Sequence, residues 1–148
     1  MLRRKELFFM GKERKELQKQ VKKWINIAEE DIRLAKFAFK MKSNIPYRLI
    51  CYHSQQAAEK YLKAFLVSRM IDFPYHHNIE LLVNLCSNIY DIKQEVKDSF
   101  ALSKYAIAKR YPGEYQKINK NDAVKCVASA EKVILTIKVL LEKDGFSI

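Results

Sequence analysis

Glycine and proline are scarce in this chain of 148 residues, with three of each. Both residue types interrupt helices, whereas the abundant Lys, Glu, Ala and Leu favour them. No apolar run approaches the ~18 residues of a membrane span. The apolar island at residues 7–10 is too short for the core of a signal peptide, and no small-residue cleavage site follows it. We therefore expect an all-α protein that resides in the cytoplasm and has no membrane partner.

The motifs of many small-molecule enzymes are also missing. The sequence contains no Walker loop, no Gly-rich dinucleotide turn, no nucleophile elbow and no paired-histidine zinc helix. Cys51, Cys86 and Cys126 lie far apart and lack metal-ligand or redox spacing, so we interpret them as small buried side chains. None of the three histidines has a suitably spaced carboxylate. We expect neither a metal site nor a cofactor.

Positive charge dominates the composition, with a formal net charge of +11. Residues 1–23 hold nine Lys or Arg against three Glu, a net +6 that exceeds half of the total. Such a segment attracts polyanions without reading their sequence. The equally supported alternative is a solvated helix extension that keeps the protein soluble. We interpret residues 1–16 as a basic arm or helix extension, and residues 17–148 as one helical domain.

Helical periodicity predicts about five helices joined by short connections. The expected helices cover residues 13 or 17 to 40, 47–68, 79–90, 91–109, and 119 or 121 to about 143. Pro46 suits the first turn of the second helix, and Asn78 is a plausible N-cap of the third. Gly145 lies just beyond the last helix, where glycine commonly terminates one. The pattern favours an up-and-down bundle.

The second expected helix, YRLICYHSQQAAEKYLKAFL at residues 47–66, has the strongest pattern. A step of about 100° per residue separates an apolar arc from a polar one. The apolar arc holds Ile50, Ala57, Ala58, Tyr61, Leu62, Ala64 and Phe65. The polar arc holds Arg48, His53, Gln55, Gln56, Glu59, Lys60 and Lys63. The two central alanines would let a neighbouring helix approach closely.

Three sequence blocks occur here in the order found in the HEPN domain family. They are YHSQQAAEKYLKAFL at 52–66, HHNIELL at 76–82 and KRYP at 109–112. The chain resembles this family over residues 24 to about 142. The resemblance implies a compact all-helical domain that is usually dimeric. It also implies links to nucleotide binding, to RNA cleavage and to pairing with small nucleotidyltransferases.

Arg48 and His53 match the Arg-x4–6-His motif that RNA-cleaving members of this family use. In those members the histidine acts on the ribose 2′-hydroxyl and the arginine stabilises phosphate charge, as suits their chemistry. Here the motif lies early in the domain, and Leu49 follows the arginine where a polar residue is usual. Five residues along a helix also correspond to about 140° of rotation. We expect no intrinsic activity; the alternative is a metal-independent, toxin-like endoribonuclease.

A second set of polar residues advances along the same helix in steps of three and four. Arg48, Tyr52, Gln55 and Glu59 form one polar line, which could hold a ligand or line a dimer groove. The other interpretation is that Arg48 and Glu59 form ion pairs that fix helix register.

A cationic loop is the other candidate for phosphate binding. Lys104, Arg110 and Tyr111 lie around it, with further lysines after it, and could hold phosphate and stack a base. Alternatively, Arg110 contacts the negative end of its own helix and neutralises a carboxylate such as Glu59.

The leading hypothesis is a nucleotide- or RNA-binding HEPN accessory module. It would be a homodimer acting with a small nucleotidyltransferase partner, as one half of a toxin–antitoxin-type pair. One alternative is the endoribonuclease that uses Arg48 and His53. A third hypothesis is an interaction module whose helices only dimerise.

Overall fold

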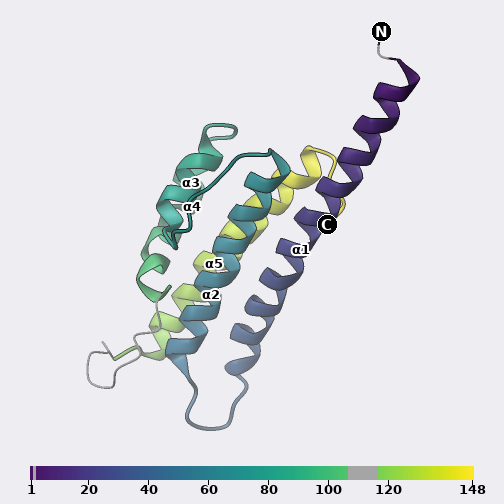
Figure 1. The fold of residues 1–148 in the computed structure, drawn as a ribbon. Helices are drawn as coiled ribbons and strands as arrows, with labels where there is room; N and C mark the ends of the chain where they lie inside the picture. Colours follow the sequence, from purple (N-terminus) through teal and green to yellow (C-terminus); the bar gives the residue numbers. More distant parts are fainter. Residues whose placement is uncertain (2, 107–116) are drawn as a thin grey trace.

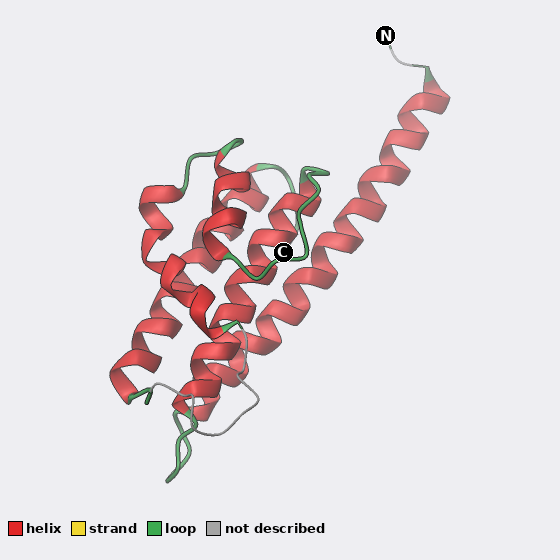
Figure 2. Ribbon diagram, turned by 60° about the vertical axis from the view of Figure 1, so that its left-hand side comes forward, coloured by secondary structure: helices red, strands yellow, loops and turns green. Residues whose placement is uncertain are grey.

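The computed structural model describes residues 1, 3–106 and 117–148. Its elements are α1 (Arg4–Ala38), α2 (Tyr47–Ser68), α3 (Ile79–Ser87), α4 (Lys93–Val96), the 3₁₀ helix η1 (Lys97–Tyr105) and α5 (Lys120–Lys143). No strand occurs in the described ranges (Figure 2). The expected all-α class is confirmed. In the same ranges no helix has both the length and the apolar character needed to cross a membrane.

Helix α2 lies at the centre of the bundle (Figure 1). Helices α1 and α5 both pack mainly on α2 and touch each other much less, while α3 and η1 cover another side of α2. Every residue of the predicted apolar arc of α2 is at most 1% exposed. Val21, Ala28 and Ala35 of α1 also join this core, because they are almost fully buried. The N-terminal part of α1 projects beyond the bundle (Figures 1 and 2).

Local sequence signals set several helix ends as predicted. Helix α2 starts directly after Pro46. The Oδ1 atom of Asn78 accepts a hydrogen bond of 3.1 Å from the Leu81 amide, which caps α3. Asn119 caps α5 in the same way. Gly145 has a φ of +85°, and its amide donates to the Glu142 carbonyl, so this glycine terminates α5 in the left-handed region.

Three elements differ from the prediction. Helix α1 begins at Arg4, well before the expected start, and runs unbroken through the basic arm. The fourth helix is replaced by the single turn of α4 and by η1, which ends at Tyr105. One serine side chain bonds a backbone carbonyl within this segment, and a second one links the segment to α3. The Ser99 hydroxyl donates to the Val96 carbonyl, and the Ser103 hydroxyl accepts from the Ile79 amide. Helix α3 also ends earlier than expected, at Ser87.

Candidate functional site

A buried polar cluster lies on α2, within the polar line that the sequence pattern predicted. Glu59 is 3% exposed and Gln55 is fully buried. The Glu59 carboxylate accepts hydrogen bonds of 2.7 Å from Gln55 Nε2 and 2.6 Å from Lys63 Nζ. His77 Nδ1 approaches the same carboxylate to 3.1 Å from the loop before α3. Each carboxylate oxygen therefore has partners within the fold.

Aromatic rings close this cluster from outside. Lys63 Nζ lies 5.7 Å from the ring centroid of Trp24 on α1 and 5.4 Å from that of Phe73. Burial alone would raise the pKa of Glu59, but the hydrogen bonds from Lys63 and Gln55 outweigh it and lower this pKa. The carboxylate is held ionised in a desolvated site. Gln55 and Glu59 are therefore buried, with side chains from α1 and from the loop between α2 and α3 around the Glu59–Lys63 pair, and their role in ligand binding stays a prediction.

A second cluster joins α2 to α1 and remains partly open to solvent. One carboxylate oxygen of Asp31, on α1, lies 2.8 Å from His53 Nδ1. The other oxygen accepts a hydrogen bond from Lys60 Nζ. The His53 side chain is 25% exposed, and its ring packs edge-on against the ring of Tyr52 at a centroid distance of 5.1 Å. Because Nδ1 bonds the carboxylate, the Nε2 atom is the free position for an outside partner. Asp31 was not among the site residues predicted from the sequence.

Arg48 occupies the first turn of α2 and is half-buried. It lies in the same helix as His53, five residues earlier, so about 7.5 Å of helix rise separates their Cα atoms along the axis. The Asp31 carboxylate fixes the orientation of the imidazole. An acidic run at residues 29–31 in an otherwise basic region was the sequence signal that could have identified this partner.

The predicted phosphate-binding cations are only partly within the described ranges. Lys104 is exposed and lines a groove of about 710 Å³ between η1 and α5. Lys97 and Lys125 line the same groove, together with Asp98 and Asp122. Arg110 and Tyr111 lie outside the described residues. Three lysines against two aspartates give this groove a net positive charge that suits a phosphate.

Two further polar groups were not predicted and serve the fold. Asp144 at the end of α5 accepts two hydrogen bonds of 2.9 Å from Arg69 and one of 3.1 Å from the Tyr90 hydroxyl. Glu29 on α1 accepts from the buried Tyr61 hydroxyl, and it pairs with a lysine of α5. A buried tyrosine hydroxyl needs a hydrogen-bond partner, so the predicted burial of Tyr61 was the sequence signal for such a contact.

The cysteines behave as predicted, since all three are free and buried. Burial raises the pKa of the Cys86 thiol to about 12, which keeps it protonated and unreactive. Among the described residues, no group of three or more His, Cys, Asp or Glu side chains is arranged to hold a metal ion.

Comparisons with known proteins agree on one family. The model of the HEPN domain matches residues 21–140. The chain is 32% identical over 148 residues to "Putative toxin MJ1304" of Methanocaldococcus jannaschii, an alignment that covers 86% of this chain and 92% of that protein. A crystal structure of ST0689, described as an archaeal HEPN homologue, superposes with a TM-score of 0.65 at 28% identity, covering 82% of this chain and 97% of that one.

A second structure, TT1696 from Thermus thermophilus, has the same fold. It superposes with a TM-score of 0.64 at 22% identity and covers 80% of this chain and 96% of that chain. The family model alone accounts for most of the sequence, and the first relative is matched over nearly its whole length. The chain belongs to the HEPN domain family.

Proposed function

We propose that this protein is a polyanion-binding HEPN module, dimeric, which recognises RNA or nucleotide phosphate and acts beside a small nucleotidyltransferase. One observation carries the proposal, namely the separation of charge between the interior and the surface. The most buried carboxylates, such as Glu59, Asp31 and Asp144, are neutralised by partners within the fold. The cations of the α1 arm are exposed instead.

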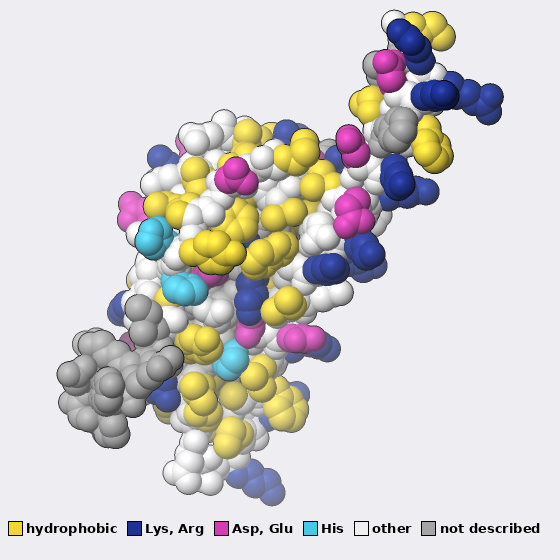
Figure 3. Space-filling model, viewed as in Figure 1, with side chains coloured by type: hydrophobic (Ala, Val, Ile, Leu, Met, Phe, Trp, Pro, Cys, Tyr) yellow, Lys and Arg dark blue, Asp and Glu magenta, His cyan; other side chains and the backbone are white. Residues whose placement is uncertain are grey.

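The arm concentrates these cations on a projecting helix. Figure 3 shows Lys and Arg side chains gathered along the part of α1 that leaves the bundle. Arg3, Arg4, Lys5 and Lys12 are all exposed there. Arg14 is different, because its guanidinium donates a 2.6 Å hydrogen bond to the Asp144 carbonyl and lies 4.0 Å from the centroid of the Phe146 ring. Residues up to about 12 are therefore available to a polyanion, while Arg14 anchors the helix to the C-terminus.

The test is fluorescence anisotropy of labelled single-stranded RNA against ionic strength. If the protein contacts three or four phosphates, its affinity for RNA should fall roughly twenty- to fifty-fold as the salt concentration rises from about 50 to 200 mM. Neutralising Arg3, Arg4 and Lys5 to Gln should lower affinity at low salt and flatten this dependence. The matched control replaces the exposed lysines at 42, 93 and 132 by Gln, which changes net charge equally. The proposal would be contradicted if the affinity for RNA did not change with salt concentration, or if both triple variants lost the same amount of affinity.

The nucleotidyltransferase partner is supported by the family resemblance. Co-expression with the nucleotidyltransferase encoded beside this chain, where one exists, should yield a complex that survives size-exclusion chromatography. Separate elution of the two proteins at micromolar concentration would remove this part of the proposal.

The endoribonuclease is a second candidate, favoured by the Asp31–His53 hydrogen bond. A carboxylate that fixes Nδ1 and leaves Nε2 free is the arrangement in which an imidazole exchanges protons with a substrate. The name of the M. jannaschii relative, a toxin, is compatible with this activity. We still expect little or no cleavage by the purified protein, since about 140° of helix rotation separates the positions of Arg48 and His53.

Cleavage of labelled RNA in the presence of a chelator separates the two candidates. Robust cleavage that His53→Ala and Arg48→Ala both abolish would promote the endoribonuclease, with losses on the order of a hundredfold or more. Asp31→Asn should then reduce the rate by misorienting the ring. Circular dichroism of each variant controls for folding.

A further inference from the structure

Helix α1 carries a second apolar stripe that the bundle does not cover. Ile27, Leu34 and Phe37 are 47%, 52% and 64% exposed. Helical geometry places them roughly 155° around the axis from the buried stripe of the same helix. An amphipathic helix needs only one apolar stripe to pack on its domain. The outer stripe therefore serves something other than the core of this chain.

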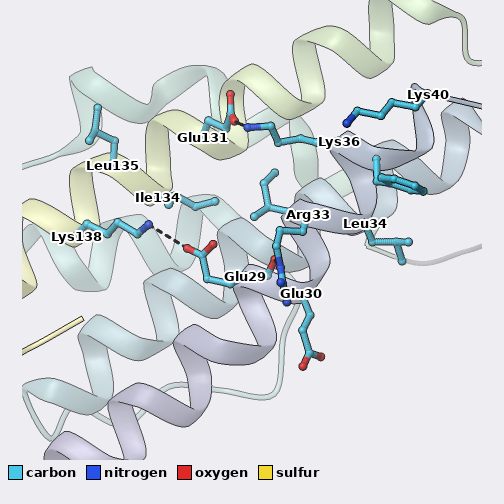
Figure 4. A pocket seen from close by; sticks show the side chains of 12 residues that line it. Glu29, Glu30, Arg33, Leu34, Lys36, Lys40, Glu131, Ile134, Leu135 and Lys138 are labelled. Carbon is cyan, nitrogen blue, oxygen red and sulfur yellow. Dashed lines mark hydrogen bonds and ion pairs between the residues drawn. The ribbon is translucent and has the colours of Figure 1, made fainter.

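A groove between α1 and α5 continues this stripe into a larger apolar surface. The two helices splay apart because each packs mainly on α2. The resulting groove holds about 1020 Å³ and is lined by Leu34 and Phe37 from α1 and by Leu135 from α5, as Figure 4 shows for the labelled side chains. Leu135 is 60% exposed. Exposed apolar side chains that gather on one face, instead of being scattered singly, favour an interaction site.

The charges around the groove indicate a protein partner. Two ion pairs bridge α1 and α5, between Lys36 and Glu131 at 2.6 Å and between Glu29 and Lys138 at 3.0 Å (Figure 4). Three glutamates and four cations line the groove in all. Two of the four cations are already paired with glutamates across the groove, so this face has little unpaired positive charge to attract RNA or an anionic membrane. Mixed charge around an apolar centre is typical of protein interfaces.

The same face is complementary to itself. We propose that it binds a second copy of this chain, with the two α1 helices antiparallel about a two-fold axis between Leu34 and Phe37. Such an axis sets Leu34 against the partner's Phe37. It also sets Glu30 level with Lys40 of the partner subunit, because both lie about five residues from the axis, on opposite sides. Glu30 and Lys40 both line the groove. Because the two-fold axis generates every contact twice, this interface contains two Leu34–Phe37 contacts and two pairs of opposite charges.

The proposed interface rests on the dimeric part of the proposed function and identifies the face through which the dimer forms. Measuring the oligomeric state tests it. Light scattering coupled to size-exclusion chromatography should give a dimer for the wild type at micromolar concentration. Phe37→Asp and Leu34→Asp should each raise the dimer dissociation constant tenfold or more, because a charge would be buried at the centre of the interface. Both residues are exposed in the monomer, so the helix content should not change. Ile89→Asp, at an exposed residue after α3, is the matched control.

Charge reversal provides an independent test that does not depend on the apolar variants. Glu30→Lys and Lys40→Glu should each weaken the dimer, and the double variant should restore it, because the two opposite charges exchange places. A monomeric wild type would overturn both this interface and the dimeric part of the proposed function. A dimer that tolerates Phe37→Asp, or reversals that do not compensate, would overturn the interface alone. RNA anisotropy on the same variants reports on the polyanion-binding proposal separately.

Discussion

Glu59→Ala tests whether the buried cluster on α2 is structural. Removing the carboxylate leaves the Lys63 ammonium group in a site where its side chain is only 10% exposed. Leaving one partner of a buried ion pair uncompensated typically destabilises a protein by about 3–5 kcal/mol. Lys63 keeps its contacts with the rings of Trp24 and Phe73, which offset part of the loss. We therefore expect the free energy of unfolding to fall by about 3 kcal/mol, a large share of the ~5–15 kcal/mol typical of such a domain.

The double variant Glu59→Leu with Lys63→Met separates loss of the pair from loss of packing. Replacing both members of a buried pair with apolar side chains is often neutral or stabilising, so the double variant should lie closer to the wild type than either single one. Urea unfolding followed by circular dichroism gives the four free energies, and their cycle should show a coupling of about 2 kcal/mol. Glu131→Ala is the control, since its pair with Lys36 is half exposed and should contribute less than about 1 kcal/mol.

Two outcomes would refute this reasoning. A loss below about 1 kcal/mol for Glu59→Ala would mean that water reaches Lys63 and that the cluster is open. Additive effects in the cycle would mean that the two groups do not stabilise each other. Either outcome would favour a ligand-binding role for the polar line on α2.

The sequence was sufficient to predict the helices whose signals are local. Helix α2 was predicted with correct bounds because Pro46 marks its start and no glycine or proline interrupts it. The capping of α3 by Asn78 and the termination of α5 at Gly145 were likewise correct. Residues within four positions of each other decide these features, so no knowledge of the tertiary structure is required.

Features that depend on distant segments could not be read in this way. Periodicity assigned Glu59 and Lys63 to a polar face by their chemical type, yet Trp24 on α1 and Phe73 and His77 in the loop between α2 and α3 contact them. The same limitation hid the partnership of Asp31 with α2, because the sequence does not reveal which residues of α1 and α2 lie side by side. The assignment of residues 1–16 as an arm remains a prediction, although α1 passes through this boundary as one continuous helix.

The remaining predictions concern stability. Because the pKa of Glu59 is lowered on folding from its ordinary 4.5, its carboxylate stabilises the fold above about pH 4.5, and this contribution disappears as the pH falls through the folded value. Urea midpoints between about pH 7 and 3 should therefore decline more steeply for the wild type than for Glu59→Gln, and parallel curves would contradict the assignment. Asp144→Ala removes the acceptor of two Arg69 hydrogen bonds and of one from Tyr90. Hydrogen bonds to charged groups contribute about 1.5–3 kcal/mol, and Asp144 is mostly buried, so we expect a loss of about 2 kcal/mol at neutral pH. Glu142→Ala, at an exposed position in the same turn, should change stability by less than about 0.5 kcal/mol. Equal effects of the two substitutions would show that the Arg69 contact does not hold the end of α5 against α2.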